Sequence, residues 1–312
     1  MAANSDLPGL GAGLLEEPAL TAALKMLELT VRRKLDGVLQ GEHLGLIPGP
    51  GSEPGEARAY QPGDDIRRME WSVTARTTQP HVRQMIADRE LETWIVVDAS
   101  ASLDFGTVNC TKRDLAVAAA AAIVHLTSGG GNRHGAIIVT GDTTVRIPAR
   151  TGRVHAQRLL KAIATTTRSV PGVRGDLHAG IEALRRPQRR RGLAVVISDF
   201  LGPINWERSL RAIGAHHELL AVEVLDPRDL ELPPVGQVRL ADAESGELTE
   251  VTITESLRAD FAAAARAHQA AVLRTIRSCG GPVLSLRTDR EWLSDVVRFV
   301  GRRRRGLAAG AG

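Results

Sequence analysis

The sequence is poor in several features that mark common classes of protein. Only 3% of its 312 residues are aromatic, so a buried core must be built mainly from Ala, Val, Leu and Ile. No apolar run approaches the ~20 residues that a membrane-spanning helix needs. The first residues, MAANSDLPGLGAG, lack the basic segment and apolar run of a secretory signal. These absences predict a cytoplasmic protein without a membrane span.

Cysteine is equally scarce, since Cys110 and Cys279 are the only two in the chain. Neither has the spacing of metal ligands, and two thiols cannot build a disulfide framework, which is typical of a reducing compartment. The glycine-rich run at 129–132 is not followed by Lys-Ser or Lys-Thr, so it does not have the pattern of a phosphate-binding loop. We therefore do not expect the protein to hydrolyse ATP itself.

The remaining composition is that of a globular protein, with 43% hydrophobic and 24% charged residues. The net charge is +4, and the arginines at 302–305 supply four positive charges, so the rest of the chain is neutral overall. Nucleic-acid binding would have to use this tail or the arginines at 189–191. Such runs are more often solvated helix ends, and we do not expect nucleic acid as a partner.

The composition and the hydrophobic periodicity of the sequence change at three places, which predicts four parts. Apolar residues at helical spacing indicate an amphipathic helix over 18–39, and the next stretch is rich in Gly, Pro and charge, as short strands and turns are. The four parts are an N-terminal helix (1–40), a small β-rich module (41–92), an α/β domain (93–301) and a basic flexible tail (302–312).

Short apolar strands alternate with longer helical stretches through the α/β domain, which predicts a doubly wound, mostly parallel sheet. The short turn after the second strand forces an antiparallel pair, so the third strand is expected at an edge. The first helix begins with Thr111 and Asp114 in the spacing of a capping box. Strands are expected at 93–98, 135–140, 144–148, 193–199, 218–225 and 282–286, and helices at 112–127, 154–166, 177–185, 206–214, 257–278 and 291–302.

The segment 226–253 interrupts this alternation. Two alternating stretches flank Ser245 and Gly246 there, which is typical of a β-hairpin. The hairpin could form one small sheet with the β-rich module of 41–92, although no residue pattern requires that pairing.

Acidic and hydroxyl residues follow two of the expected strands. Asp98, Ser100 and Ser102 come after the first strand, and Ser198 and Asp199 end the fourth. Ligands of open α/β sheets bind at the carboxyl ends of the strands, where the strand order reverses. Two carboxylates and two hydroxyls in one crevice form an all-oxygen site for a hard cation such as Mg²⁺, which would offset the repulsion between the carboxylates.

The stretch D-A-S-A-S resembles the D-x-S-x-S signature of von Willebrand factor A domains. The metal-ion-dependent adhesion site (MIDAS) of that family binds Mg²⁺ or Mn²⁺. The resemblance implies that Ser100 and Ser102 coordinate the metal directly and that Asp199 acts mainly through water. It also implies an antiparallel edge strand.

The resemblance is closer still to a bacterial variant of the A domain, the domain of unknown function 58 family, over residues from about 41 to 300. Members of that family are commonly associated with MoxR-type AAA+ ATPases, so the resemblance implies such an ATPase as partner. The matching segments are Gly41-Glu42-His43, Tyr60-Gln61-Pro62-Gly63-Asp64-Asp65-Ile66-Arg67, Glu70-Trp71, Ala75-Arg76, the Asp98 motif, Ile197-Ser198-Asp199-Phe200 and Leu225-Asp226-Pro227-Arg228.

The chain departs from the A-domain pattern at one position. Many A domains carry a metal-binding Thr in a Gly-Thr-Asp-Leu stretch, and Gly175 stands in its place here, followed by Asp176. Glycine has no side-chain oxygen, so water fills the position, Asp176 becomes a ligand, or the metal binds weakly.

Within the β-rich module, Asp64, Asp65, Arg67 and Arg76 suggest a salt-bridged network that fastens the module to the α/β domain, with Trp71 as its apolar anchor. A second active site there is the alternative that we favour less.

Two functions remain for the metal site. The first is a non-enzymatic interaction module, an adaptor or co-chaperone whose Mg²⁺ (or Mn²⁺) binds a carboxylate of the partner protein. The alternative is a Mg²⁺-dependent hydrolase, a phosphoesterase or nuclease that uses Asp98 and Asp199 as ligands.

Overall fold

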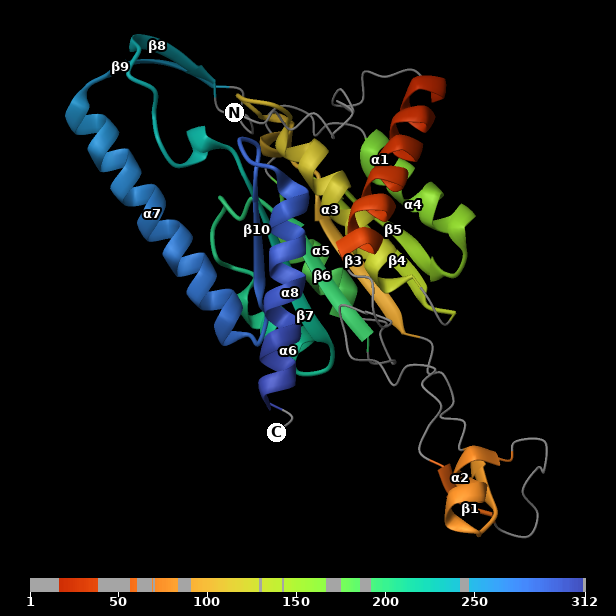
Figure 1. Ribbon diagram of the computed structural model, residues 1–312. Helices are drawn as coiled ribbons and strands as arrows, with labels where there is room; N and C mark the ends of the chain where they lie inside the picture. The colour runs from red at the N-terminus through yellow and green to blue at the C-terminus, as the bar shows by residue number, and fades with distance from the viewer. Residues whose placement is uncertain are drawn as a thin grey trace.

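The computed structural model is built around one six-stranded sheet (Figure 1). It describes residues 17–38, 57–60, 69, 71–83, 91–128, 131–141, 143–166, 175–185, 192–241 and 247–310. The strand order is β10-β7-β6-β3-β4-β5. All neighbours are parallel except β4 and β5, so the mostly parallel sheet and its antiparallel edge strand are confirmed. The strands are β3 (Glu92–Asp98), β4 (Arg133–Thr140), β5 (Thr143–Arg150), β6 (Gly192–Ser198), β7 (Glu218–Leu225) and β10 (Val283–Arg287).

Helices cover both faces of the sheet, because its central strands β3, β4, β6 and β7 are apolar on both sides. Along β3, Ile95 and Val97 face one core while Trp94 and Val96 face the other. The first core is closed by α1 (Glu17–Val38), α3 (Lys112–Thr127), α4 (Arg153–Thr165) and α8 (Trp292–Gly310), and the second by α5 (Leu177–Arg185), α6 (Glu207–Gly214) and α7 (Glu255–Ser278).

Helix α3 is the most deeply buried helix, and its alanines allow close packing between the sheet and α1. The predicted capping box is confirmed. The Thr111 hydroxyl accepts from the Asp114 backbone N–H (3.1 Å), and the Asp114 carboxylate accepts from the Thr111 backbone N–H (3.0 Å). Helix α1 lies across α3 with Leu27 and Leu35 fully buried, so the N-terminal helix belongs to the core of the α/β domain.

The second predicted module is partly helical, which corrects the expectation of strands and turns. Strands β1 (Ala57–Ala59) and β2 (His81–Arg83) pair with each other, and between them lies α2 (Trp71–Thr77). Residues 71–77 contain no Gly or Pro, so nothing in them opposes a helical turn. Figure 1 shows α2 and β1 lying apart from the six-stranded sheet.

Trp71 is not the predicted anchor, because 70% of its side chain is exposed. Arg76 is exposed and its Nε donates to the Ser72 carbonyl (3.4 Å). The predicted network partners at 64, 65 and 67 lie outside the described residues.

The predicted hairpin of the insertion is present as β8 (Gly236–Ala241) and β9 (Leu248–Ile253), which pair antiparallel. It forms a two-stranded sheet of its own and shares no ladder with β1 and β2. The proposed joint sheet of the module and the insertion is therefore wrong for the described strands. A short 3-10 turn, η4 (Pro227–Asp229), connects β7 to this region.

At the C-terminus, α8 continues to Gly310, so residues 302–310 are helical where a flexible tail was expected. The Arg303 guanidinium forms an ion pair with Glu218 at the start of β7, which ties this part of the helix to the sheet. Within the described ranges, no helix combines the length and the apolar character needed to cross a bilayer.

Candidate metal centre

The site lies where the strand order reverses. From β3, the chain adds β4 on one side of the sheet and later β6 on the other, and β3 and β6 run parallel with Val97 opposite Ile197. The carboxyl ends of both strands therefore meet at one edge, which is where open α/β sheets bind ligands. Asp98 ends β3, and Asp199 follows the last residue of β6.

Asp98 is held by hydrogen bonds from both strand ends. One carboxylate oxygen accepts from the Ser100 backbone N–H (3.0 Å) and the other from the Ser198 hydroxyl (2.7 Å). Only 7% of Asp98 is exposed. Burial raises the pKa of Asp98, and the nearby charge of Asp199 raises it further, while the serine hydrogen bonds oppose the rise.

The two serines of the signature lie together. The backbone of Ser100 is extended, and a 3-10 turn, η3 (Ala101–Asp104), follows directly. This conformation brings the Ser100 and Ser102 hydroxyl oxygens within 3.0 Å of each other. Asp98, Ser100 and Ser102 therefore meet as the sequence predicts, and Ser198 joins them although the predicted ligand set did not include it.

Asp199 is paired with a buried lysine that the sequence analysis missed. The ammonium of Lys112, the first residue of α3, lies 2.8 Å from one Asp199 oxygen, and the other accepts from the Leu201 backbone N–H (3.3 Å). Lys112 also lies 3.2 Å from the carboxylate of Asp229. Only 1% of its surface is exposed. The available signal was a lysine that opens an otherwise alanine-rich, buried helix.

The pKa of the Lys112 ammonium is raised, although burial acts strongly in the opposite direction. The charges of Asp199 and Asp229, together with their hydrogen bonds, outweigh the desolvation. Lys112 therefore carries its charge at neutral pH.

Asp226 holds Asp229 in place from the same turn. Asp226 is fully buried and accepts from the Thr107 hydroxyl (2.6 Å) and backbone N–H (2.8 Å), the Thr288 hydroxyl (2.6 Å) and the Arg228 backbone N–H (2.9 Å). In turn, the Asp226 backbone N–H donates to Asp229 (2.8 Å). Despite the cost of burial, these donors lower the pKa of Asp226. The motif at the end of β7 thus joins three loops and positions Asp229 beside Lys112.

The charges around Lys112 do not balance. The ammonium of Lys112 contacts the carboxylates of Asp199 and Asp229, and among the described residues no cation contacts the buried carboxylate of Asp98. The adjacent Arg113 is already engaged by Asp104 (2.5 Å). A divalent cation beside Asp98 would supply the positive charge that the ionised form of this carboxyl group needs, since Lys112 faces Asp199 and Asp229.

Gly175 lies against the serines, and the packing explains the absence of threonine. A Cβ added to Gly175 would lie 2.7 Å from the Ser100 Cβ and 3.5 Å from an Asp98 oxygen. Asp176 is exposed, and its carboxylate accepts from the Ala179 backbone N–H (3.0 Å), as the N-cap of α5 does. In the structure Asp176 caps α5, and its role as a metal ligand stays a prediction.

The donor set fits a hard cation only if hydroxyls take part. Among the described residues, no group of three or more His, Cys, Asp or Glu side chains has the geometry of a metal site. One carboxylate and two adjacent hydroxyls, with water completing the shell, match the preference of Mg²⁺ for oxygen ligands and retained waters. The pairing of Asp199 with Lys112 agrees with an indirect role for that carboxylate.

Comparison with known proteins places the chain in a family. The model of the family described as protein of unknown function DUF58 matches residues 56–271, more than half of the chain. The chain belongs to the DUF58 family. Other similar proteins are uncharacterised proteins of Mycobacterium bovis and Mycobacterium tuberculosis, each 69% identical over 303 residues, which cover 97% of this chain and 96% of the relative.

Solved structures similar to this DUF58 protein have low identity. One is the conserved hypothetical protein BatB of Bacteroides thetaiotaomicron, with a TM-score of 0.46 and 15% identity over 69% of this chain and 99% of that chain. Another is a von Willebrand factor type A protein of Catenulispora acidiphila, with a TM-score of 0.40 and 10% identity over 72% of this chain and 44% of that chain.

Proposed function

We propose that this DUF58 protein is a non-enzymatic, metal-dependent protein-interaction module. Asp98, Ser100 and Ser102 hold one Mg²⁺ at the edge of the sheet, with Asp199 acting through water. A carboxylate of the partner protein completes the coordination shell. The metal supplies a localised positive charge, so the binding energy concentrates on one charge-assisted contact in a partly dry site.

The observation that carries this proposal is the buried carboxyl group of Asp98, which contacts no cation among the described residues. Its carboxyl group is buried beside that of Asp199, while the ammonium that the structure describes in this cluster, that of Lys112, faces Asp199 and Asp229. Buried carboxylates need a cationic partner or must take up a proton. The adjacent hydroxyls of Ser100 and Ser102 supply the oxygen ligands that a cation beside Asp98 would need.

The kind of partner follows from the surroundings and from the family resemblance. Phe105 and Leu201 lie in the loops that follow β3 and β6, and each residue is 41% exposed. Apolar residues beside a metal-bound carboxylate suit a protein surface better than a small anion. A MoxR-type AAA+ ATPase, the partner that the resemblance implies, is therefore the proposed protein, with this chain as its adaptor or co-chaperone.

Metal binding is tested by calorimetric titration of the metal-free protein with Mg²⁺. We expect one site in the wild type and a loss of affinity of at least about tenfold, or about 1.4 kcal/mol, in Ser100→Ala/Ser102→Ala. The control is Ser256→Ala/Ser278→Ala, which removes two hydroxyls from α7. An equal affinity in all three proteins contradicts the proposed ligands.

The partner is tested with a purified MoxR-type ATPase from the same source organism. Association that requires Mg²⁺, is abolished by EDTA and is lost in the Ser100/Ser102 variant supports the adaptor. Association that survives both EDTA and the double substitution contradicts the proposed bridge through the metal.

The rival hydrolase is tested with p-nitrophenyl phosphate and a DNA duplex in the presence of Mg²⁺ or Mn²⁺. The proposal expects no turnover above the protein-free rate. Turnover that Asp98→Ala abolishes would overturn it.

A further inference from the structure

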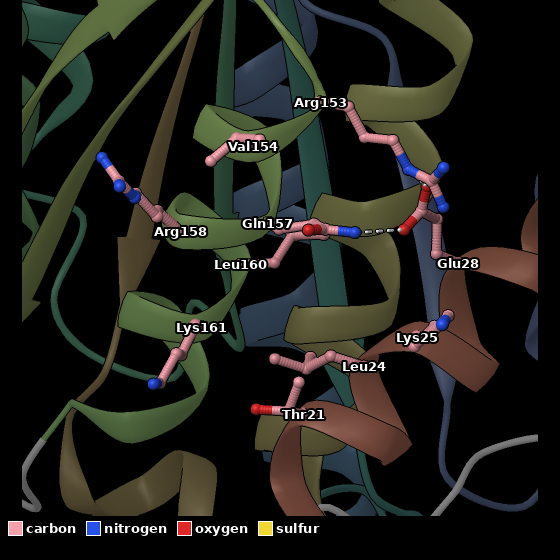
Figure 2. Close-up of a pocket in the computed structure, with 10 residues that line it drawn as sticks. All are labelled: Thr21, Leu24, Lys25, Glu28, Arg153, Val154, Gln157, Arg158, Leu160 and Lys161. Atoms are coloured by element: carbon pink, nitrogen blue, oxygen red, sulfur yellow. Dashed lines mark hydrogen bonds and ion pairs between the residues drawn. The ribbon is translucent and has the colours of Figure 1, made fainter. Parts of the chain in front are cut away.

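A groove between α1 and α4 combines an apolar floor with a cationic rim (Figure 2). We propose that this α1–α4 groove docks an acidic amphipathic helix of a partner protein, independently of the metal centre. The groove has a volume of about 570 Å³ and is lined by Thr21, Leu24, Lys25 and Glu28 of α1 and by Arg153, Val154, Gln157, Arg158, Leu160 and Lys161 of α4.

The segment of the chain that contains α4 carries only positive charges. Between residues 143 and 175 the chain has seven Lys and Arg residues and no Asp or Glu. The stretch includes the edge strand β5 and the whole of α4. Three of these cations, Arg153, Arg158 and Lys161, line the groove. Arg146 instead lies over Trp94 on the opposite face of the sheet.

Glu28, the one acidic residue among the described lining residues, is already engaged. Glu28 accepts from Arg153 Nε (2.8 Å) and from Gln157 Nε2 (3.1 Å), which ties α1 to α4 across one end of the groove. Four cationic side chains line the groove against this single carboxylate, so the lining retains a net positive charge. Lys25 and Arg158 are exposed on opposite walls.

The second property of the groove is its apolar floor. Leu24 and Leu160 face each other between the two helices, and Val154 is 63% exposed beside them. A concave apolar strip between two helices is the shape that an amphipathic helix fills with residues at i, i+3, i+4 and i+7. The cations at the rim select acidic residues beside those anchors.

The other anionic ligands fit less well. Among the described residues no aromatic side chain lines the groove, so these residues offer the bases of single-stranded nucleic acid no stacking surface. A bilayer is bound by several apolar side chains that project outwards. Val154 projects outwards, but Leu24 and Leu160 lie at the bottom of the concavity.

The test uses the full chain in EDTA, so that the metal centre does not contribute. The probe is a fluorescein-labelled helical peptide of about 18 residues, with Leu on one face and Glu on its flanks, and binding is followed by anisotropy. We expect saturable binding that weakens about tenfold in Lys25→Glu/Arg158→Glu. The control Arg266→Glu/Arg274→Glu changes the charge equally on the exposed surface of α7 and should bind as the wild type does.

Three companion probes decide the class of occupant. These are the same peptide with Lys in place of Glu, a DNA duplex, and phosphatidylcholine–phosphatidylglycerol vesicles. Failure of the acidic peptide to bind, or binding that the groove variant leaves unchanged, overturns the proposal. Tighter binding of DNA or vesicles that the groove variant abolishes also overturns it, because the groove would then serve a different ligand.

Discussion

Replacing Lys112 with Met should destabilise the fold by about 3–5 kcal/mol at neutral pH, the usual cost of removing one partner from a buried ion pair. Methionine keeps most of the aliphatic volume, so little of the loss comes from a cavity. The loss comes instead from the carboxylates of Asp199 and Asp229, which lie 2.8 Å and 3.2 Å from the ammonium and would remain buried without it.

The loss should depend on pH in a defined direction. Burial already raises the pKa of Asp229, and the charge of Lys112 opposes that rise, so the substitution raises this pKa further. A carboxyl group whose folded-state pKa exceeds its unfolded value destabilises the protein as the pH rises through the folded value. The difference between Lys112→Met and the wild type should therefore be smaller at pH 5 than at pH 7.5.

Guanidinium chloride unfolding followed by circular dichroism measures both effects. Lys25→Met is the matched control, because Lys25 is exposed and its loss should change stability by no more than about 0.5 kcal/mol. Adding Asp229→Asn to Lys112→Met removes one buried charge and should recover part of the loss, which also keeps the comparison measurable if the single variant unfolds. A single variant within about 1 kcal/mol of the wild type at both pH values would refute the assigned role of Lys112.

Three further predictions concern groups around the sheet. Burial, and secondarily the charge of His155, lowers the pKa of His134 to about 4, so unfolding takes up a proton as the pH falls below 6.5. The wild type should lose about 2 kcal/mol between neutral pH and pH 5, and denaturant titrations of His134→Gln should show a smaller loss. Asp226→Asn turns a four-bond acceptor partly into a donor and should cost about 1–3 kcal/mol in thermal unfolding, whereas an unchanged melting temperature would contradict the role of Asp226 in joining the three loops. Gly175→Ala places a Cβ 2.7 Å from that of Ser100 and should cost about 1–3 kcal/mol while weakening Mg²⁺ binding in calorimetry; an unaltered affinity would show that Gly175 does not shape the site.

Local patterns predicted the sheet well because its elements satisfy local rules. Strand β3 reads as an apolar run because both faces are buried, and α3 begins with a capping box that the structure contains. The short turn before β5 fixed its antiparallel direction without reference to the rest of the chain. The position of Asp98 and Asp199 at one edge was expected if their two strands were neighbours, and the parallel pairing of β3 with β6 meets that condition.

The parts that escaped prediction depend on contacts between distant segments. Lys112 lies 87 residues from Asp199 and 117 from Asp229 along the chain, and no local pattern joins them. From the sequence, Gly175 was interpreted as the loss of a metal ligand. The structure shows that a side chain at this position would not fit beside Ser100. Trp71 was assigned to an interface because large apolar residues are usually buried, but its side chain is exposed on α2.

The buried ammonium also bears on how many cations the site can hold. Two-metal hydrolases place their ions about 3.5–4 Å apart and neutralise both with shared carboxylates. Here Lys112 lies within 3.2 Å of both Asp199 and Asp229, so the place that a second ion would take beside these carboxylates already carries a fixed positive charge. A second cation would meet repulsion from the ammonium, whereas one cation beside Asp98 meets only uncompensated carboxylate charge and the two serine hydroxyls. This asymmetry favours a single ion with a coordination position left for a partner, and it is the reason that we favour an interaction site over a hydrolytic one.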